Sequence, residues 1–106
     1  MITFKIYQIK DIENTDYSFM EFKPDKFNFS DYEERYAAEF DSEADQTDLE
    51  ICETLFTIFN FRKPEDFKGH SMSVSDVIEL TRNGRTKFYY CDTYGFTEIL
   101  VNKNNK

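Results

Sequence analysis

The chain has 106 residues, of which 40% are hydrophobic and 18% aromatic, and its formal net charge is −8. This content of large apolar side chains excludes a disordered chain and fits one domain, over residues 1–106, with one core. No apolar run is long enough to cross a membrane, and the N-terminus lacks the pattern of a signal peptide. We therefore expect a cytoplasmic protein, in which Cys52 and Cys91 are reduced and buried.

The negative charge is concentrated in one region of the chain. Residues 31–53 contain ten acidic residues and a single basic residue, Arg35. Direct binding to nucleic acid is disfavoured, because neutralising phosphates requires clustered lysine and arginine. An acidic surface suits a protein partner with a basic surface, including a basic groove that normally holds nucleic acid.

The first half of the chain shows strand signals and one ambiguous stretch. Residues 2–9 alternate, which predicts a strand whose inward face carries Ile2, Phe4, Ile6 and Gln8. Residues 17–29 are aromatic and contain Pro24, which favours an irregular segment that packs its rings into the core; a ligand-binding aromatic patch is the alternative. At residues 32–40 the aromatic side chains fit a helical repeat and also one face of a strand, so the period alone leaves both open.

The second half has clearer local signals. Thr47 and Glu50 form a capping box that starts a predicted helix over residues 48–60. The pair Asn83-Gly84 is a strong hairpin signal between strands predicted at 74–80 and 86–91, and a last short strand is expected within 96–101. Together these elements predict an α+β fold: a small, mainly antiparallel sheet packed on one principal helix.

The stretch from Gly69 to Asp76 contains residue types that could support catalysis. It holds the only histidine, His70, close to serines and an aspartate, as in a Ser-His-Asp triad. If the stretch is extended, however, His70 and Asp76 lie about 20 Å apart at ~3.3 Å per residue, whereas a sharp turn near Gly69 or Ser73 would change this separation. We therefore expect no catalytic residues, and interpret the stretch as a structural motif that joins the helix to the hairpin through hydrogen bonds. Its residues are Gly69, His70, Ser71, Ser73, Ser75 and Asp76.

A metal site and a cofactor site are also not expected. Asp41, Glu43, Asp45 and Asp48 have a spacing similar to that of a calcium loop, but Gln46 stands where that loop requires glycine. Two cysteines and one histidine do not form a zinc site of usual composition. A solvated acidic loop is therefore the favoured interpretation, and we predict no metal and no cofactor.

Two segments carry a family resemblance. Residues 64–78, Pro-Glu-Asp-Phe-Lys-Gly-His-Ser-Met-Ser-Val-Ser-Asp-Val-Ile, and residues 88–96, Phe-Tyr-Tyr-Cys-Asp-Thr-Tyr-Gly-Phe, resemble the YodL-like domain family of Gram-positive bacteria and their mobile elements. Residues 3–9 and 17–20 also resemble it, whereas the match is weakest at 41–48. The resemblance favours a strand at residues 32–40.

The resemblance implies a small domain without an established enzymatic activity, carried on conjugative elements and phages. Such elements encode inhibitors of host defence, so we expect a stand-alone, non-enzymatic inhibitor of a defence nuclease, with an anti-CRISPR protein that binds a CRISPR nuclease as the best candidate. We expect a monomer or weak homodimer that binds neither nucleic acid nor membrane directly. The alternatives are a docking module for another mobile-element protein, which would use an aromatic sheet surface, and a small enzyme that uses His70 and Asp76.

The predicted binding surface combines charge with aromatic rings. If residues 32–40 form an edge strand, some rings point outward beside carboxylates, where aromatic residues are favoured as interface anchors. The other interpretation is that the rings belong to the core and that the acids only keep the domain in solution. The predicted protein-binding residues are Asp31, Tyr32, Glu33, Glu34, Tyr36, Glu39, Asp41 and Glu43.

Overall fold

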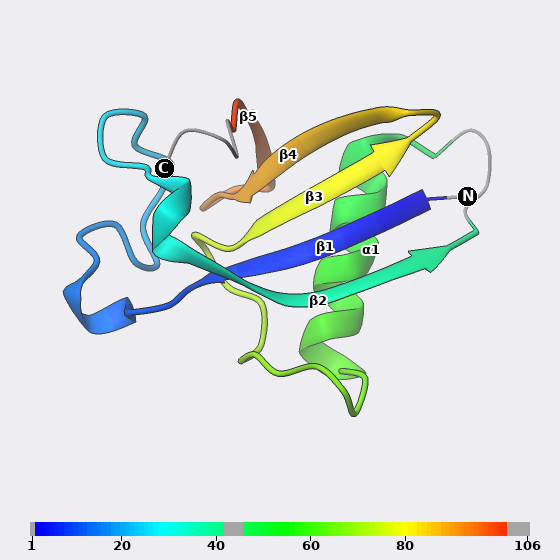
Figure 1. Cartoon of the computed structure of the whole chain (residues 1–106), viewed down its shortest axis with the longest axis horizontal. Helices are drawn as coiled ribbons and strands as arrows, with labels where there is room; N and C mark the ends of the chain where they lie inside the picture. Colours follow the sequence, from blue (N-terminus) through cyan, green and yellow to red (C-terminus); the bar gives the residue numbers. More distant parts are fainter. Residues whose placement is uncertain (1, 42–45, 102–106) are drawn as a thin grey trace.

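The computed structural model describes residues 2–41 and 46–101. One α-helix of this part of the chain, α1, lies on one face of a five-stranded antiparallel sheet and runs across its strands (Figure 1). The predicted α+β fold is confirmed. The strand order is β2-β1-β3-β4-β5, with bounds β1 Ile2–Ile9, β2 Tyr32–Phe40, β3 Val77–Arg82, β4 Arg85–Cys91 and β5 Phe96–Ile99.

The helix α1, Asp48–Phe61, starts at the predicted capping box. The backbone amide of Glu50 donates to Thr47 Oγ1 at 3.1 Å, and the amide of Thr47 donates to Glu50 Oε1 at 2.9 Å. The helix ends one residue later than predicted, with the Arg62 amide donating to the Ile58 carbonyl at 2.7 Å. Its start and length therefore follow from local sequence signals.

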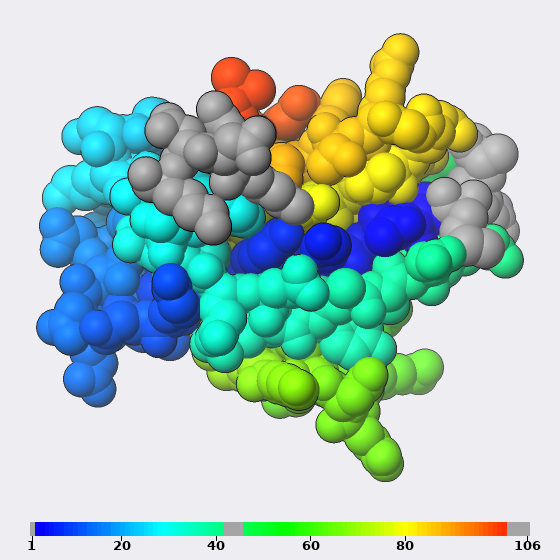
Figure 2. All heavy atoms as spheres, viewed as in Figure 1, coloured from blue at the N-terminus to red at the C-terminus, as the bar shows by residue number. Residues whose placement is uncertain are grey.

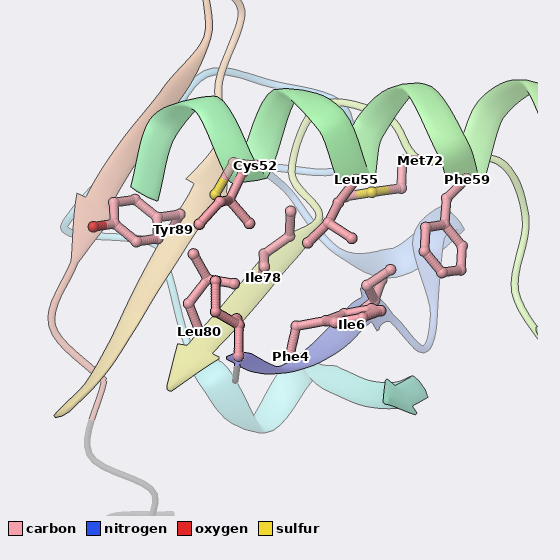
Figure 3. Close-up of a cluster of buried hydrophobic side chains, with 11 residues drawn as sticks. Phe4, Ile6, Cys52, Leu55, Phe59, Met72, Ile78, Leu80 and Tyr89 are labelled. Atoms are coloured by element: carbon pink, nitrogen blue, oxygen red, sulfur yellow. The ribbon is translucent and has the colours of Figure 1, made fainter. Parts of the chain in front are cut away.

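The buried side chains form two clusters, one on each face of the sheet, where one core was expected. The first cluster fills the space between α1 and the sheet (Figure 3). The second lies on the opposite face, where Tyr7 and Ile9 of β1 are covered by the predicted irregular segment after β1, including the buried Tyr17. The prediction that this segment packs its rings into the core is confirmed, with Phe19 as an exception because its side chain is 53% exposed.

The stretch at 32–40 forms strand β2, and it lies at the edge of the sheet. Its register with β1 shifts between Ile6, which is opposite Tyr36, and Tyr7, which is opposite Glu34. Arg35 is thus an extra residue on β2, which makes a β-bulge. A one-residue bulge shifts the alternation of side chains, so that residues before and after it that would share a face of a regular strand point to opposite faces of the sheet. Tyr32 accordingly packs in the second cluster, whereas Tyr36 packs against the first.

The hairpin has the predicted turn but a shorter first strand. Asn83 and Gly84 have φ angles of 52° and 76°, as a two-residue turn with positive φ at both positions requires. Strand β3 begins at Val77 and not at residue 74, because residues 73–76 form a turn in which the Asp76 amide donates to the Ser73 carbonyl at 3.1 Å. Strand β5 ends at Ile99, within the predicted range.

Cys52 and Cys91 are free and buried, as predicted. Within residues 2–41 and 46–101, no helix is long and apolar enough to span a membrane.

Candidate functional site

Four exposed carboxylates line the edge of the sheet: Glu33, Glu34 and Glu39 on β2, and Asp41 directly after it. We call these four residues the acidic edge. Glu33 pairs with Arg35 at 2.8 Å and Glu34 with Lys5 at 3.7 Å. Neither Glu39 nor Asp41 forms an ion pair with a described residue. Figure 2 shows β2 as a continuous row of atoms on this face of the molecule, with atoms of the chain after α1 beside part of the row.

The other predicted binding residues have structural contacts. Tyr32 is only 7% exposed, and its hydroxyl donates to the Ser75 carbonyl. The Tyr36 ring packs against Phe59, with ring centroids 5.2 Å apart, and Asp31 accepts a hydrogen bond from the Tyr17 hydroxyl at 2.8 Å. The Tyr32 ring therefore belongs to the core, whereas the Tyr36 ring is half-buried and packs against the first cluster.

Glu43, the last predicted binding residue, lies outside the described residues.

A groove runs between β2 and α1, next to the acidic edge. Its volume is about 270 Å³, and most of the side chains that line it are apolar. The lining residues from the sheet and the chain after α1 are Phe4, Tyr36, Ala38, Glu39, Phe40 and Pro64, and those from α1 are Thr54, Leu55, Ile58 and Phe59. The groove thus places an apolar surface directly beside exposed negative charge.

A buried polar cluster lies at the other end of β1, and we call Gln8, His70, Ser73 and Asp76 the Gln8 cluster. Gln8 is 0% and Asp76 1% exposed. The Gln8 side-chain amide donates to Asp76 Oδ2 and to the His70 carbonyl, both at 2.9 Å, and its nitrogen lies 3.3 Å from His70 Nδ1. The Ser73 amide also donates to Asp76 Oδ2, at 2.9 Å.

The predicted separation of His70 and Asp76 is wrong. It assumed an extended chain, whereas the turn at residues 73–76 folds the chain back, with Ser75 at a φ of 85°. Both residues therefore meet the same Gln8 amide. Within this turn, the Ser73 amide also donates to the Asp76 carboxylate.

The model of one protein family, the YodL-like domain, matches residues 3–101 of this chain. The chain belongs to the YodL-like domain family. The match covers both the Gln8 cluster and the acidic edge, so both are parts of this YodL-like domain. Comparison with curated proteins and with solved structures gives no match.

The Gln8 cluster of the YodL-like domain has unusual electrostatics. Burial raises the pKa of the Asp76 carboxyl to about 7, although the hydrogen bonds from Gln8 and Ser73 act in the opposite direction. His70 Nδ1 lies 2.7 Å from the Ser71 carbonyl, which can only accept, so Nδ1 carries the proton of this hydrogen bond. Because Asp76 is buried and already hydrogen-bonded, the cluster is suited to holding the chain after α1 against β1.

Three further side-chain atoms of the cluster are buried without a hydrogen-bond partner among the described residues: Gln8 Oε1, His70 Nε2 and Ser73 Oγ. Gln8 Oε1 faces Gly69 so closely that a Cβ atom added to Gly69 would lie 2.0 Å from it. The structural role predicted for Gly69 thus has a definite cause, which is close approach of the Gln8 amide.

Gln8 is the residue of this cluster that sequence reasoning missed. The signal was available, because the alternation of residues 2–9 places a polar side chain on the inward face of a strand. A polar group on a buried face needs hydrogen-bond partners. In the described part of the chain, no three His, Cys, Asp or Glu side chains lie close enough together to hold a metal ion.

Proposed function

We propose that this YodL-like domain is a non-enzymatic binding protein whose acidic edge binds a basic surface of a protein partner. The observation that carries the proposal is the exposure of four carboxylates along one sheet edge, two of which form no ion pair with a described residue. Opposite charges on a partner would speed association and select it over acidic proteins.

The partner that we propose is a nuclease of a host defence system, with a CRISPR effector as the best candidate. Glu33 and Asp41 are eight residues apart in the chain, or roughly 25 Å at ~3.3 Å per residue. The charges are therefore spread along a line, as they are along a nucleic-acid backbone. A groove that normally holds nucleic acid would offer matching basic side chains, and the resemblance to domains of mobile elements supports the same choice.

A second candidate function is that of a docking module for another mobile-element protein. The apolar groove between β2 and α1 favours it, since such a groove can bind a partner through packing with little dependence on salt. The burial of Asp76 argues against the third candidate, an enzyme built on His70 and Asp76, because a substrate would not reach that carboxyl.

Reversal of the acidic edge tests the first proposal. We expect that changing Glu33, Glu34, Glu39 and Asp41 together to lysine abolishes capture of the partner in a pull-down from a host lysate. The wild-type complex should also dissociate at lower salt than a complex held by apolar contacts. Because the pairs Glu33–Arg35 and Glu34–Lys5 lie on the surface, their loss should change stability by only about 1 kcal/mol or less.

The matched control reverses four exposed carboxylates elsewhere: Glu13, Asp25, Glu65 and Glu98. This control has the same net charge as the edge-reversal variant, and we expect it to capture the partner as the wild type does. A second edge variant, with glutamine or asparagine at the same four positions, separates loss of attraction from new repulsion. Capture that is unchanged in the edge variants, or lost equally in the control, would rule the proposal out.

A further inference from the structure

Strand β2 has one side on which a further strand can bind. It pairs with β1 on its inner side, and no described strand pairs with its outer side. Beyond the bulge at Arg35, the register with β1 runs without a shift from Tyr36 to Phe40. This regular half of β2 is the half that borders the apolar groove. An edge strand with free backbone groups is a template for pairing with another chain.

The groove lies where one face of an added strand would project its side chains. On β2, Tyr36, Ala38 and Phe40 pack against the cluster beneath α1, whereas Ala37 and Glu39 alternate with them and are exposed, and Glu39 also borders the groove. Side chains of a neighbouring strand alternate in the same way. One set would enter the groove beside the small side chain of Ala38, and the other set would lie near Glu39.

The charge of this edge determines which chain would fit. A second copy of β2 would bring Glu39 and Asp41 close to the same carboxylates of its partner, and like charges directly opposite each other destabilise strand pairs. A segment with lysine or arginine near these carboxylates would instead gain attraction. Apolar residues at the alternate positions would fill the groove, whose lining is mostly apolar.

We propose that β2 binds an extended basic segment of a protein partner as an additional strand, with alternate apolar side chains in the groove between β2 and α1. The proposal rests on the proposed function for the basic character of the partner, and adds how that partner is held. Main-chain hydrogen bonds to β2 would supply affinity, and the groove would supply specificity, as in other cases of strand addition.

The test uses a defined probe, an eight-residue peptide of alternating lysine and valine with blocked ends. In ¹⁵N-HSQC titrations of the whole chain, we expect saturable shifts of amides in 36–40 and in the facing part of α1. A peptide of alternating glutamate and valine should cause none of these shifts. Absence of saturable shifts with the lysine peptide, or shifts located elsewhere, would overturn the proposal.

Two neighbouring alanines provide a matched pair of variants. The side chain of Ala38→Phe would fill the groove. We expect this variant to weaken binding of the lysine peptide by about tenfold or more, and a tenfold change in affinity corresponds to about 1.4 kcal/mol. Ala37→Phe adds the same side chain on the exposed face and should leave affinity within about twofold, since it does not enter the groove. Equal effects of the two variants would contradict strand addition. If edge reversal abolishes partner capture while Ala38→Phe does not, the proposed function stands and strand addition fails.

Discussion

Replacing Gly69 with alanine is expected to lower the free energy of unfolding by about 3 kcal/mol. The new Cβ would lie 2.0 Å from Gln8 Oε1 and 3.0 Å from the Phe67 ring. Gln8 has no free space to enter, because it is 0% exposed and its amide already binds Asp76 and the His70 carbonyl. Moving it would therefore break buried hydrogen bonds in addition to the steric cost. Urea denaturation would measure the loss as a lower midpoint with an unchanged slope.

Two comparisons identify the cause of this loss. Gly84→Ala places a methyl group where no atom lies within 4 Å, at a φ of +76°, so it should cost only about 1 kcal/mol of backbone strain. In a Gln8→Ala background, Gly69→Ala should lose most of its effect, because the clashing amide is gone. An equal cost in both backgrounds would show that the Gln8 side chain is not the reason for glycine at this position.

The second large effect concerns pH and Asp76. Because burial raises the pKa of this carboxyl to about 7 in the folded state, against 3.8 ordinarily, the folded protein binds its proton more tightly than the unfolded chain does. Stability should therefore fall as pH rises from about 4 to about 7, on the order of 3 kcal/mol in total for this residue. Asp76→Asn should remove this decline, since an amide oxygen can still accept from Gln8 and Ser73 without becoming charged.

Thermal or urea unfolding between about pH 2 and pH 8 would measure the difference between wild type and Asp76→Asn. Asp92 is a suitable contrast, because hydrogen bonds from Thr97 and from the amides of Thr93 and Phe22 outweigh burial and hold its pKa below its usual value. The stability that Asp92 contributes is present above its unfolded pKa and is lost on acidification, so Asp92→Asn should change the curve below about pH 4. Parallel curves for wild type and Asp76→Asn across the range would refute the role of Asp76.

The elements with local signals were predictable from the sequence. The capping box at Thr47 and the Asn83-Gly84 turn each depend on residues that are neighbours in the chain. The predicted start of strand β3 was three residues too early, because the turn that precedes this strand is stabilised by a residue that is distant in the sequence. The Tyr32 hydroxyl donates to the Ser75 carbonyl, and Ser75 adopts a positive φ that no local pattern of serines indicates.

The candidate site was predictable in its charge and not in its shape. Exposure of Glu33, Glu34, Glu39 and Asp41 follows from their chemistry, whereas the placement of the tyrosine rings depends on a single extra residue, Arg35, in the register with β1. The Gln8 cluster depends on contacts between residues more than 60 positions apart. Alternation indicates that Gln8 faces inward, but the identity of its partners requires the sheet order.

The position of β1 has a consequence for synthesis of the protein. Of the five described strands β1 is synthesised first, yet it lies in the sheet between β2 and β3, and Ile6 pairs with both Tyr36 and Ile78. Until the second of these partners is made, β1 can pair only with β2 and its other edge lacks a partner strand, and intermediates with such edges tend to aggregate. The carboxylates of β2 would lie beside that apolar strand throughout this interval. Because charged side chains that flank an apolar strand oppose aggregation, we expect the acidic edge to reduce aggregation of the growing chain.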